Sequence, residues 1–405
     1  MTTDEKETKN TRKSKQPINE IKSPLLPEKH ASEEFKWAPF AGAVFNLSTS
    51  IIGAGIMALP TTIKVLGLGL GLGMIVFVAV LTEASLEMLL RFSRVGKSES
   101  YGEVMGDAFG VVGRRLLQIC ILLNNVGTLI VYMIIIDSLR HTSALAIALA
   151  IVFLIITAGI TILKLFNGSV AMPRLLPKVT DITSVWSLFT AVPVLVIAFI
   201  CHFNVHTIDN ELEDSSLIQP VVKTSLALCS IIYILTSFFG FLLFGDSTLD
   251  DILANFDANL GIPYSFLLND VVRISYALHL MLVFPILLYP LRLNLDGLFF
   301  PTARPLVANN VRFGLISIGL LLLVFLGANF IPNIWDAFQF TGATATVCIG
   351  FIFPATIALR DPHAIATKKD KILSVFMVAL AVFSNMVAIY SDAYTILKKN
   401  VNTNA

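Results

Sequence analysis

Long apolar runs separated by short polar stretches alternate along almost the whole chain. A helix needs about 20 mostly apolar residues to cross the hydrocarbon core of a bilayer, and about ten runs approach that length. The pattern therefore predicts an all-α polytopic membrane protein. After a first run that contains Val44–Pro60, the runs have the approximate limits Leu66–Leu90, Leu116–Ile136, Ala144–Phe166, Ile182–Phe203, Val221–Phe244, Tyr264–Leu291, Phe313–Phe330, Ile334–Ala358 and Leu373–Ile396.

The first run differs from a plain spanning helix at its centre. Gly53 and Gly55 flank a single alanine, and each glycine costs a helix about 1 kcal/mol relative to alanine. Asn46 and Ser50 add polar side chains at a similar depth. Freed backbone groups are tolerated in hydrocarbon only where protein or a water-filled cavity satisfies them, and broken helices of this kind carry transporter binding sites. We predict a broken helix here; the alternative is a glycine-lined contact between two helices.

Composition supports the membrane class. Of the 405 residues, 55% are hydrophobic and only 14% are charged, against about 25% charged in an average soluble domain. The four cysteines lie in or beside apolar runs without metal-type spacing, so we interpret them as small core residues. Residues 1–36 are rich in Lys, Glu, Thr, Ser and Pro, which predicts a disordered cytoplasmic tail.

Charges between the runs conflict with ten consecutive crossings. From a cytoplasmic tail, the basic connection Arg91–Arg115 lies inside, as the positive-inside rule requires. The acidic loop Asp246–Asp257 then also lies inside, and the later basic loops lie outside. One additional crossing between the third and fourth runs corrects all of them. We therefore predict that the chain lacks one transmembrane helix between Ile136 and Asp137; the alternatives are an awkward crossing after Asp137 or a third run that re-enters.

A few polar side chains lie within the apolar runs. Glu83 is the deeper of two glutamates in the second run, and a carboxylate there marks an ion or proton route or is paired structurally. Asn124, Asn125 and Thr128 either bond across helices or line a cavity. His202, at the end of its run, either titrates or lies at the interface.

Three motifs resemble those of a known family. They are VFNLSTSIIGAGIMALP from Val44, AFICHFNVHTIDNELED from Ala198 and VFPILLYPLRLNLDGLFFP from Val283. These stretches are similar to the amino acid/auxin permease family, and the likeness is closest to its plant vacuolar branch. It covers the chain after Lys36. Family members have eleven helices against about ten here, which agrees with the helix missing from the charge pattern.

The resemblance implies a broken-helix inverted-repeat transporter fold of the amino acid–polyamine–organocation type. The transmembrane domain spans 37–400, with repeats at about 37–166 and 180–358 and a final helix at about 372–396. Its two mid-membrane breaks match Ser50–Ile56 and about Ala198–Asn204. The implied substrate-binding residues are Asn46, Ser50, Ile51, Ile52, Gly53, Ala54, Gly55, Phe199 and His202.

One departure from the family pattern concerns the coupling ion. Sodium-coupled animal members carry hydroxyls in the eighth helix just before a proline, whereas the residues ahead of Pro285 run from His279 to Phe284 without one. Apolar side chains supply no hard oxygen ligands to sodium. The departure favours proton coupling, with His279 and Glu83 as candidate carriers. For His279 the alternative is a structural bond to a neighbouring helix.

The sequence favours a secondary active transporter, proton-coupled, that moves neutral or acidic amino acids across the vacuolar membrane, with the plasma membrane as the alternative location. A second hypothesis is a non-transporting isoform or amino acid sensor that associates with full-length relatives. No nucleotide-binding, zinc-type or nucleophile motif is present, so we expect no enzyme activity, cofactor or nucleic-acid partner. The expected partners are an amino acid, a proton rather than sodium, and the lipid bilayer.

Overall fold

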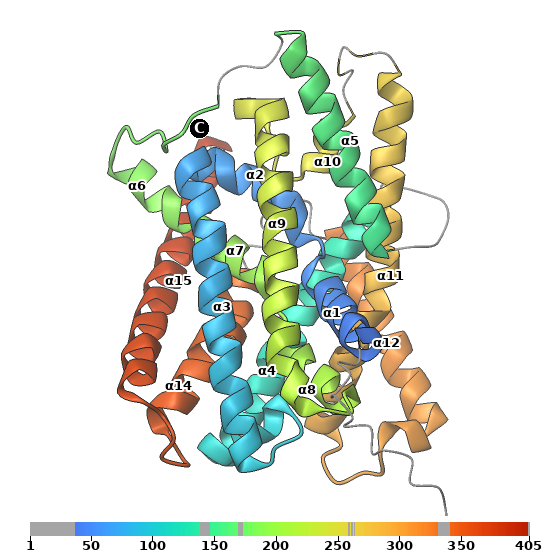
Figure 1. The fold of residues 1–405 in the computed structure, drawn as a ribbon, viewed down its shortest axis with the longest axis vertical. Helices are drawn as coiled ribbons and strands as arrows, with labels where there is room; N and C mark the ends of the chain where they lie inside the picture. Colours follow the sequence, from blue (N-terminus) through green and yellow to red (C-terminus); the bar gives the residue numbers. More distant parts are fainter. Residues whose placement is uncertain are drawn as a thin grey trace, which may run out of the picture. The chain divides into compact units, whose positions relative to one another are not determined.

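The computed structural model describes residues 37–137, 146–168, 173–257, 260, 262, 264–330 and 341–403, and every regular element in these ranges is a helix (Figure 1). The predicted tail at 1–36 and most of the junction after Asp137 lie outside them. The α-helices are α1 (Trp37–Ile51), α2 (Gly55–Leu66), α3 (Leu68–Gly96), α4 (Tyr101–Asp137), α5 (Ala146–Phe166), α6 (Ile182–Phe189), α7 (Ala191–Phe199), α8 (His202–Glu211), α9 (Ile218–Phe244), α10 (Ile252–Asn255), α11 (Ser265–Phe299), α12 (Asn310–Phe330), α14 (Phe353–Arg360) and α15 (Lys368–Thr403). Short 3-10 helices are η1 (Ser215–Leu217), η2 (Gly245–Ser247) and η3 (Leu306–Ala308), and the π-helical stretches are η4 (Gly342–Thr346) and η5 (Cys348–Ile352).

The predicted fold class is confirmed. Within the described residues, seven helices are long and apolar enough to cross a bilayer, and α1 with α2 makes a further span that is bent by 60°. Two shorter apolar helices, Ala150–Phe166 and Thr344–Arg360, occupy the remaining apolar runs. The chain is thus a multi-pass integral membrane protein.

One predicted connection was wrong, and the first span extends past its motif. α2 continues around Pro60 to Leu66. The basic connection Arg91–Arg115 is mostly helical, since α3 continues to Gly96 and α4 already begins at Tyr101. Both helices thus carry a charged segment beyond their apolar run. Gly110 interrupts α4 with φ 66°, a backbone region that glycine adopts at no steric cost.

Both predicted breaks are present. α1 ends at Ile51 and α2 begins at Gly55, and α7 ends at Phe199 before α8 begins at His202. Between α7 and α8, Ile200 takes an extended conformation with ψ 121°. The two breaks meet, because a Cβ on Gly55 would lie 2.9 Å from the Ala198 Cα. Glycine therefore allows two interrupted backbones to touch in the interior.

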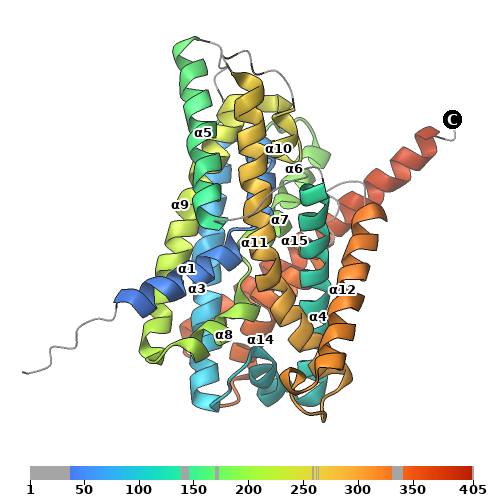
Figure 2. The same ribbon diagram turned by 90° about the vertical axis from the view of Figure 1, so that its right-hand side faces the viewer.

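The long helices form one bundle around these breaks. α11 packs against α4 and α5, and α9 packs against α2, α3 and α5 (Figure 2). α12 is exposed along most of its length, and only 11% of its most apolar stretch is buried, as expected for a helix that faces lipid. The residues at the breaks are buried inside this bundle.

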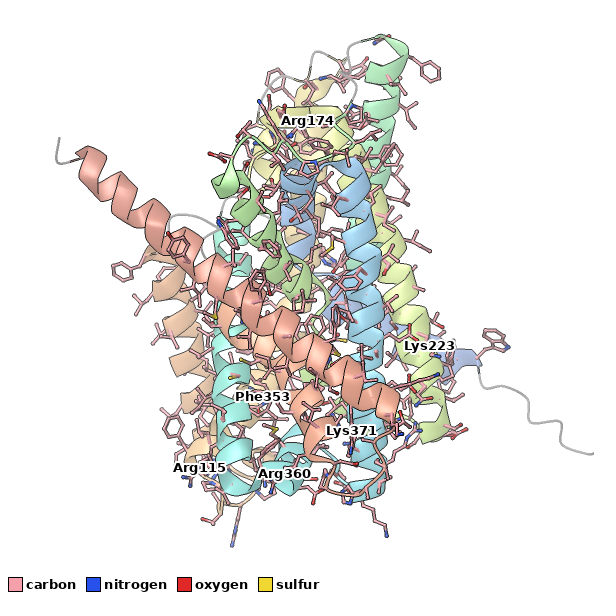
Figure 3. The ribbon with its side chains drawn as sticks, turned by 90° about the vertical axis from the view of Figure 1, so that its left-hand side faces the viewer. Arg115, Arg174, Lys223, Phe353, Arg360 and Lys371 are labelled. Atoms are coloured by element: carbon pink, nitrogen blue, oxygen red, sulfur yellow. The ribbon has the colours of Figure 1, made fainter. Side chains whose placement is uncertain are left out.

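Charge separates the two ends of the bundle. Arg115 and Arg360 lie at one end, which we call the basic end, and Arg174 lies at the other (Figure 3). Arg174 bonds there to the Lys64 carbonyl and to Asp246, which opens the acidic loop. The basic end collects the connections α3–α4, α11–α12 and α14–α15. This arrangement agrees with the prediction that one crossing is missing, because it places the acidic loop opposite all three basic connections.

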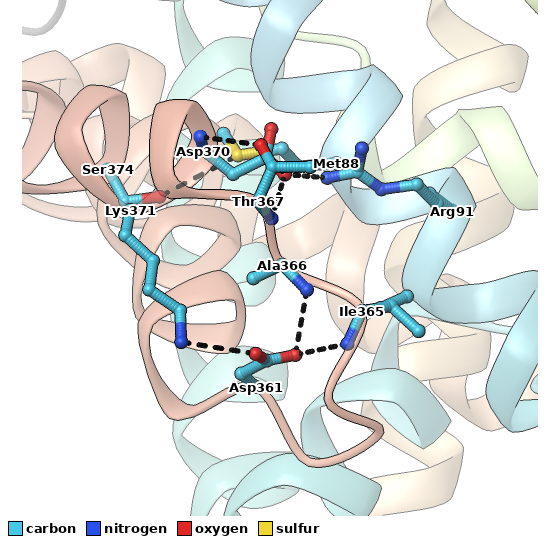
Figure 4. A network of polar contacts seen from close by, with 9 residues as sticks. All are labelled: Met88, Arg91, Asp361, Ile365, Ala366, Thr367, Asp370, Lys371 and Ser374. Carbon is cyan, nitrogen blue, oxygen red and sulfur yellow. Dashed lines mark hydrogen bonds and ion pairs between the residues drawn. The ribbon is translucent and has the colours of Figure 1, made fainter.

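Hydrogen bonds fix the α14–α15 turn at the basic end (Figure 4). Asp361 accepts from the N–H groups of Ile365 and Ala366 at 2.7 and 3.0 Å and pairs with Lys371 at 3.2 Å. Its partial burial alone raises the pKa of Asp361, but these donors outweigh that effect and hold the pKa below its usual value. In the first turn of α15, Asp370 ties this helix to Arg91 of α3 at 2.6 Å.

Candidate functional site

A small cavity lies where the two breaks meet. It measures about 20 Å³, which is room for about one water molecule and too little for an amino acid. Its walls come from the α1–α2 break, from the α7–α8 break and from α4 and α11. The lining residues are Ser50, Ile51, Gly53, Ala54, Gly55, Asn124, Thr128, Tyr132, Ile197, Ile200, Phe203 and Leu287.

The carbonyl groups freed by the breaks are satisfied by side chains from other helices. Tyr233 of α9 lies 2.7 Å from the carbonyl oxygens of both Ile51 and Ala198, so one hydroxyl joins the two breaks. From α11, Tyr276 donates to the Gly53 carbonyl at 2.5 Å and His279 Nε2 lies 2.8 Å from the Ile52 carbonyl. An unpaired buried backbone group costs free energy, and these donors remove that cost.

Tyr132 of α4 lines the cavity next to Gly53 and Ala54. Its hydroxyl is hydrogen-bonded to the backbone of Ala54, and it would lie 1.9 Å from a Cβ placed on Gly53. Gly53 is therefore required because the phenol occupies the space of a side chain. The first N–H groups of a helix have no partner within the helix, so the start of α2 offers donors at this point.

The wall formed by α4 is held by amide and hydroxyl groups. Asn124 donates to Asn125 at 2.9 Å, and its own oxygen accepts from Thr346 of η4 at 2.6 Å. A Cβ on Gly127 would lie 2.2 Å from the Thr341 hydroxyl, so α4 approaches this segment closely. Of the two interpretations from sequence, both apply: Asn124 and Thr128 line the cavity, while Asn124 and Asn125 also bond to neighbours.

A larger vestibule opens next to the cavity, and Ser50 lines both. The vestibule has a volume of about 430 Å³, enough for an amino acid. The other lining residues are Asn46, Asn204, Thr207, Ile208, Glu211, Ile286 and Tyr289. Asn204 is 6% exposed, and its side-chain nitrogen has no hydrogen-bond partner within the part of the chain that the structure describes. The vestibule therefore presents an unused donor close to the breaks.

The structure brings together most of the predicted substrate residues. Ser50, Ile51, Gly53, Ala54 and Gly55 line the cavity, and Asn46 lines the vestibule.

Three predicted residues lie behind the cavity wall. Ile52 is fully buried and presents its carbonyl to His279. Phe199 packs against the Tyr233 ring at a centroid distance of 5.0 Å. His202 points to Ser85 of α3, with His202 Nε2 3.0 Å from the serine oxygen. Direct substrate contact by these side chains stays a prediction.

The two candidate proton carriers have very different surroundings. His279 is fully buried and bonded to the α1–α2 break. Glu83 lies 3.5 Å from Lys223 of α9, and both side chains are partly exposed. Glu83 thus lies outside the cavity, and its role as a proton carrier stays a prediction.

Sequence reasoning missed the tyrosines. Tyr132, Tyr233 and Tyr276 are all buried, and each hydroxyl reaches backbone at a break. A signal was present, because a tyrosine within a spanning run has to find a partner for its hydroxyl. Which backbone group it reaches depends on how distant segments pack, and no local pattern gives this.

Broken spans that enclose a small polar cavity at mid-bundle define a membrane transporter of the broken-helix class. The profile of the family described as transmembrane amino acid transporter protein matches residues 40–140 and 135–397. The chain belongs to this family of amino acid transporters.

Relatives agree over nearly the whole chain. The chain is 59% identical to amino acid transporter AVT6A and 56% identical to AVT6B of Arabidopsis thaliana. These alignments cover 94% and 95% of this chain and 95% and 96% of the relatives. AVT6C of the same plant is 39% identical over 93% of this chain and 99% of its own length.

The comparisons also bear on the missing helix. The two profile matches meet at residues 135–140, the predicted junction. The alignment with AVT6A runs over 437 positions, so at least 32 of them have no counterpart among the 405 residues of this chain. A spanning helix needs about 20 residues. Both observations agree with the loss of one helix between Ile136 and Asp137.

Proposed function

We propose that this chain is a secondary active transporter that couples proton movement to the movement of neutral or acidic amino acids across the vacuolar membrane. The observation that carries the proposal is the polar cavity between two broken helices, with a vestibule that already reaches one of them. We propose that the basic end faces the cytoplasm, because basic connections stay on that side.

The chemistry of the α1–α2 break suits an amino acid. N–H groups at the start of α2 carry a partial positive charge that attracts a carboxylate, and the end of α1 carries the opposite partial charge, which attracts an ammonium group. Tyr132 now holds the backbone of Ala54. A substrate carboxylate takes the place of this hydroxyl, and the cavity expands toward the vestibule.

His279 is the proton carrier that the geometry favours. Its ring lies against the Ile52 carbonyl, and Tyr276 holds the next carbonyl along the chain. A protonated imidazole places a positive charge next to these carbonyl groups, where the sodium-coupled relatives hold a cation by resemblance. Among the described residues, no group of three or more His, Cys, Asp or Glu side chains is arranged for a metal.

The direction of two neighbouring helices favours a second function. α4 and α5 run in the same direction along the bundle (Figures 1 and 2), although only residues 138–145 connect them. Such a connection reaches at most about 30 Å when fully extended. Two consecutive spans that run in the same direction normally have a further crossing of about 20 residues between them. The alternative is therefore a non-transporting isoform or amino acid sensor that associates with full-length relatives.

Uptake into vesicles separates the two functions. The full chain is reconstituted, and uptake of labelled alanine and glutamate is measured with a proton gradient, a sodium gradient or neither. We expect uptake that follows the proton gradient alone and that becomes independent of it in H279Q. Uptake driven by sodium contradicts the proposed coupling.

A second arm tests the alternative function. If the chain gives no uptake, and insertion of the corresponding AVT6A segment at the junction restores it, the non-transporting isoform is the correct function. A fluorescent fusion imaged in plant cells tests the vacuolar location, which a signal confined to the plasma membrane contradicts.

A further inference from the structure

A second buried polar cluster lies on the face of α8 that points away from the vestibule. It contains His202 and His206, which are four residues apart and therefore on one face of the helix. The two rings are 1% and 4% exposed. Opposite them on α3 are Ser85 and Ser93, so each histidine meets one serine.

The hydrogen bonds of Ser85 fix the tautomer of His202. Ser85 donates its only hydroxyl proton to the carbonyl of Gly350, which the π-helical stretch η5 leaves available. The same oxygen lies 3.0 Å from His202 Nε2. Because the serine proton is already used, the imidazole has to donate, and neutral His202 carries its proton on Nε2.

His206 repeats this arrangement two turns of α3 further on. Ser93 donates to the Ser98 carbonyl at 2.6 Å, and its oxygen lies 3.2 Å from His206 Nε2. Neutral His206 is therefore also protonated on Nε2. In both rings Nδ1 is buried and has no hydrogen-bond partner among the described residues. Each ring thus keeps one unused proton acceptor in the interior.

Few titratable groups face this pair. From α4, the Tyr101 ring stacks on His206 at 6.2 Å, and its hydroxyl donates to the Ile349 carbonyl of η5. Among the described residues neither imidazole makes an ion pair. Charged residues on the same two helices are Asp209 of α8, three residues after His206, and Arg94 at the end of α3, which interacts with Asp209. Cys348 of η5 adds a thiol beside Tyr101.

We propose that His202 and His206 form a proton-binding site that holds α8 on α3 when both rings are neutral and releases α8 when they are protonated. A proton added at Nδ1 creates a buried cation whose new N–H donor has no acceptor, which is costly in a dry interior. Two such cations one turn apart also repel each other. Separation of α8 from α3 lets water reach both rings.

Release of α8 changes the vestibule, because the opposite face of the same helix lines it. Asn204, Thr207 and Glu211 alternate along α8 with the two histidines and face the vestibule. The site therefore links acidity at the basic end to the width of the vestibule. This link does not depend on which amino acid or ion the cavity takes.

Cysteine labelling tests the site without transport. Thr207→Cys is introduced into the full chain with its four native cysteines replaced by alanine, and labelling by a maleimide is followed between about pH 8 and about pH 5. Each rate is divided by that of Lys97→Cys, which cancels the pH dependence of the thiol itself. We expect the ratio to rise as the pH falls, by up to about tenfold per pH unit for each proton taken up.

The matched variants are H202Q/H206Q and H363Q. A glutamine amide donates to the serines without titrating, so the double variant should show a ratio that is low and independent of pH. His363 pairs with Asp107 at 2.6 Å on the same end of the bundle, and H363Q should retain the pH dependence of the parent.

Two results would overturn the proposal. One is a flat ratio in the parent, and the other is the same pH dependence in the double variant. If the double variant does not fold, S93A gives an independent measurement, because loss of the acceptor for His206 should raise the ratio already at neutral pH. An S93A ratio equal to that of the parent at neutral pH contradicts the proposal equally.

Discussion

Replacement of Gly55 by alanine is the sharpest test of how the two broken helices fit together. A Cβ at this position lies 2.9 Å from the Ala198 Cα and 3.2 Å from its Cβ. Both atoms belong to the end of α7 and cannot rotate away as a long side chain does. Because carbon atoms in contact normally lie about 3.5–4.0 Å apart, the breaks have to separate by at least about half an ångström.

The expected cost follows from overpacking. Added atoms in a filled interior cost about 1–3 kcal/mol, and the preference of a helix for alanine over glycine returns at most about 1 kcal/mol. G55A should therefore lower the free energy of unfolding by about 1–2 kcal/mol. G73A is the matched control, because no atom lies within 4 Å of its new Cβ, and this variant should be as stable as the parent or more so.

Thermal unfolding in detergent and amino acid uptake in vesicles measure the two effects. We expect G55A to unfold at a lower temperature than G73A and to take up less substrate, since the start of α2 moves away from the cavity. A198G in the G55A background removes the 3.2 Å contact and leaves the 2.9 Å contact, so it should rescue in part. A G55A protein as stable and as active as G73A refutes the close fit of the breaks.

Two further predictions concern single side chains, and a third concerns the sides of the membrane. Y233F leaves the carbonyls at the two breaks without their shared donor and should reduce the free energy of unfolding by about 1–3 kcal/mol, which chemical denaturation measures; an unchanged value contradicts the bridge. The lowered pKa of Asp361 means that its carboxylate stabilises the α14–α15 turn above its unfolded pKa of about 4 and stops doing so as the pH falls through the folded value. Hydrogen exchange in this turn should therefore be faster in D361N than in the parent at neutral pH and equal in both in strong acid. Equal exchange rates at neutral pH contradict the stabilising role of this carboxylate. An impermeant label should reach Asp250→Cys and Lys97→Cys from opposite sides of the membrane, and labelling of both from one side contradicts the placement of the acidic loop opposite the basic end.

Local patterns were sufficient for the membrane class and for the first break. Apolar length alone indicated the spans, and the Gly53–Gly55 pair with nearby polar residues located the first break within a residue or two. The second break at Ile200–Cys201 rested on the resemblance, because nothing between Ala198 and Asn204 other than His202 and Asn204 departs from an apolar helix.

Charge predicted the missing crossing, and the fold agrees with that prediction. The acidic loop and the basic connections lie at opposite ends of the bundle, where the packing of α11 against α4 and α5 holds the later spans. Side chains at the site were harder to foresee. His279 was found as an ionisable residue in a span, but its partner, the Ile52 carbonyl, lies 227 residues away in the sequence.

The sequence by itself determined that the chain crosses a membrane many times and that its first span is interrupted at the two glycines, and its charge pattern predicts that one crossing is absent. These properties depend on hydrophobicity, backbone freedom and charge, all of which are local. Only the tertiary structure decided that tyrosines and a histidine from α9 and α11 satisfy the open carbonyls, that Tyr132 lines the cavity, and that His202 bonds to Ser85 of α3. Those contacts join residues far apart in the chain, so they exist only once the helices have packed.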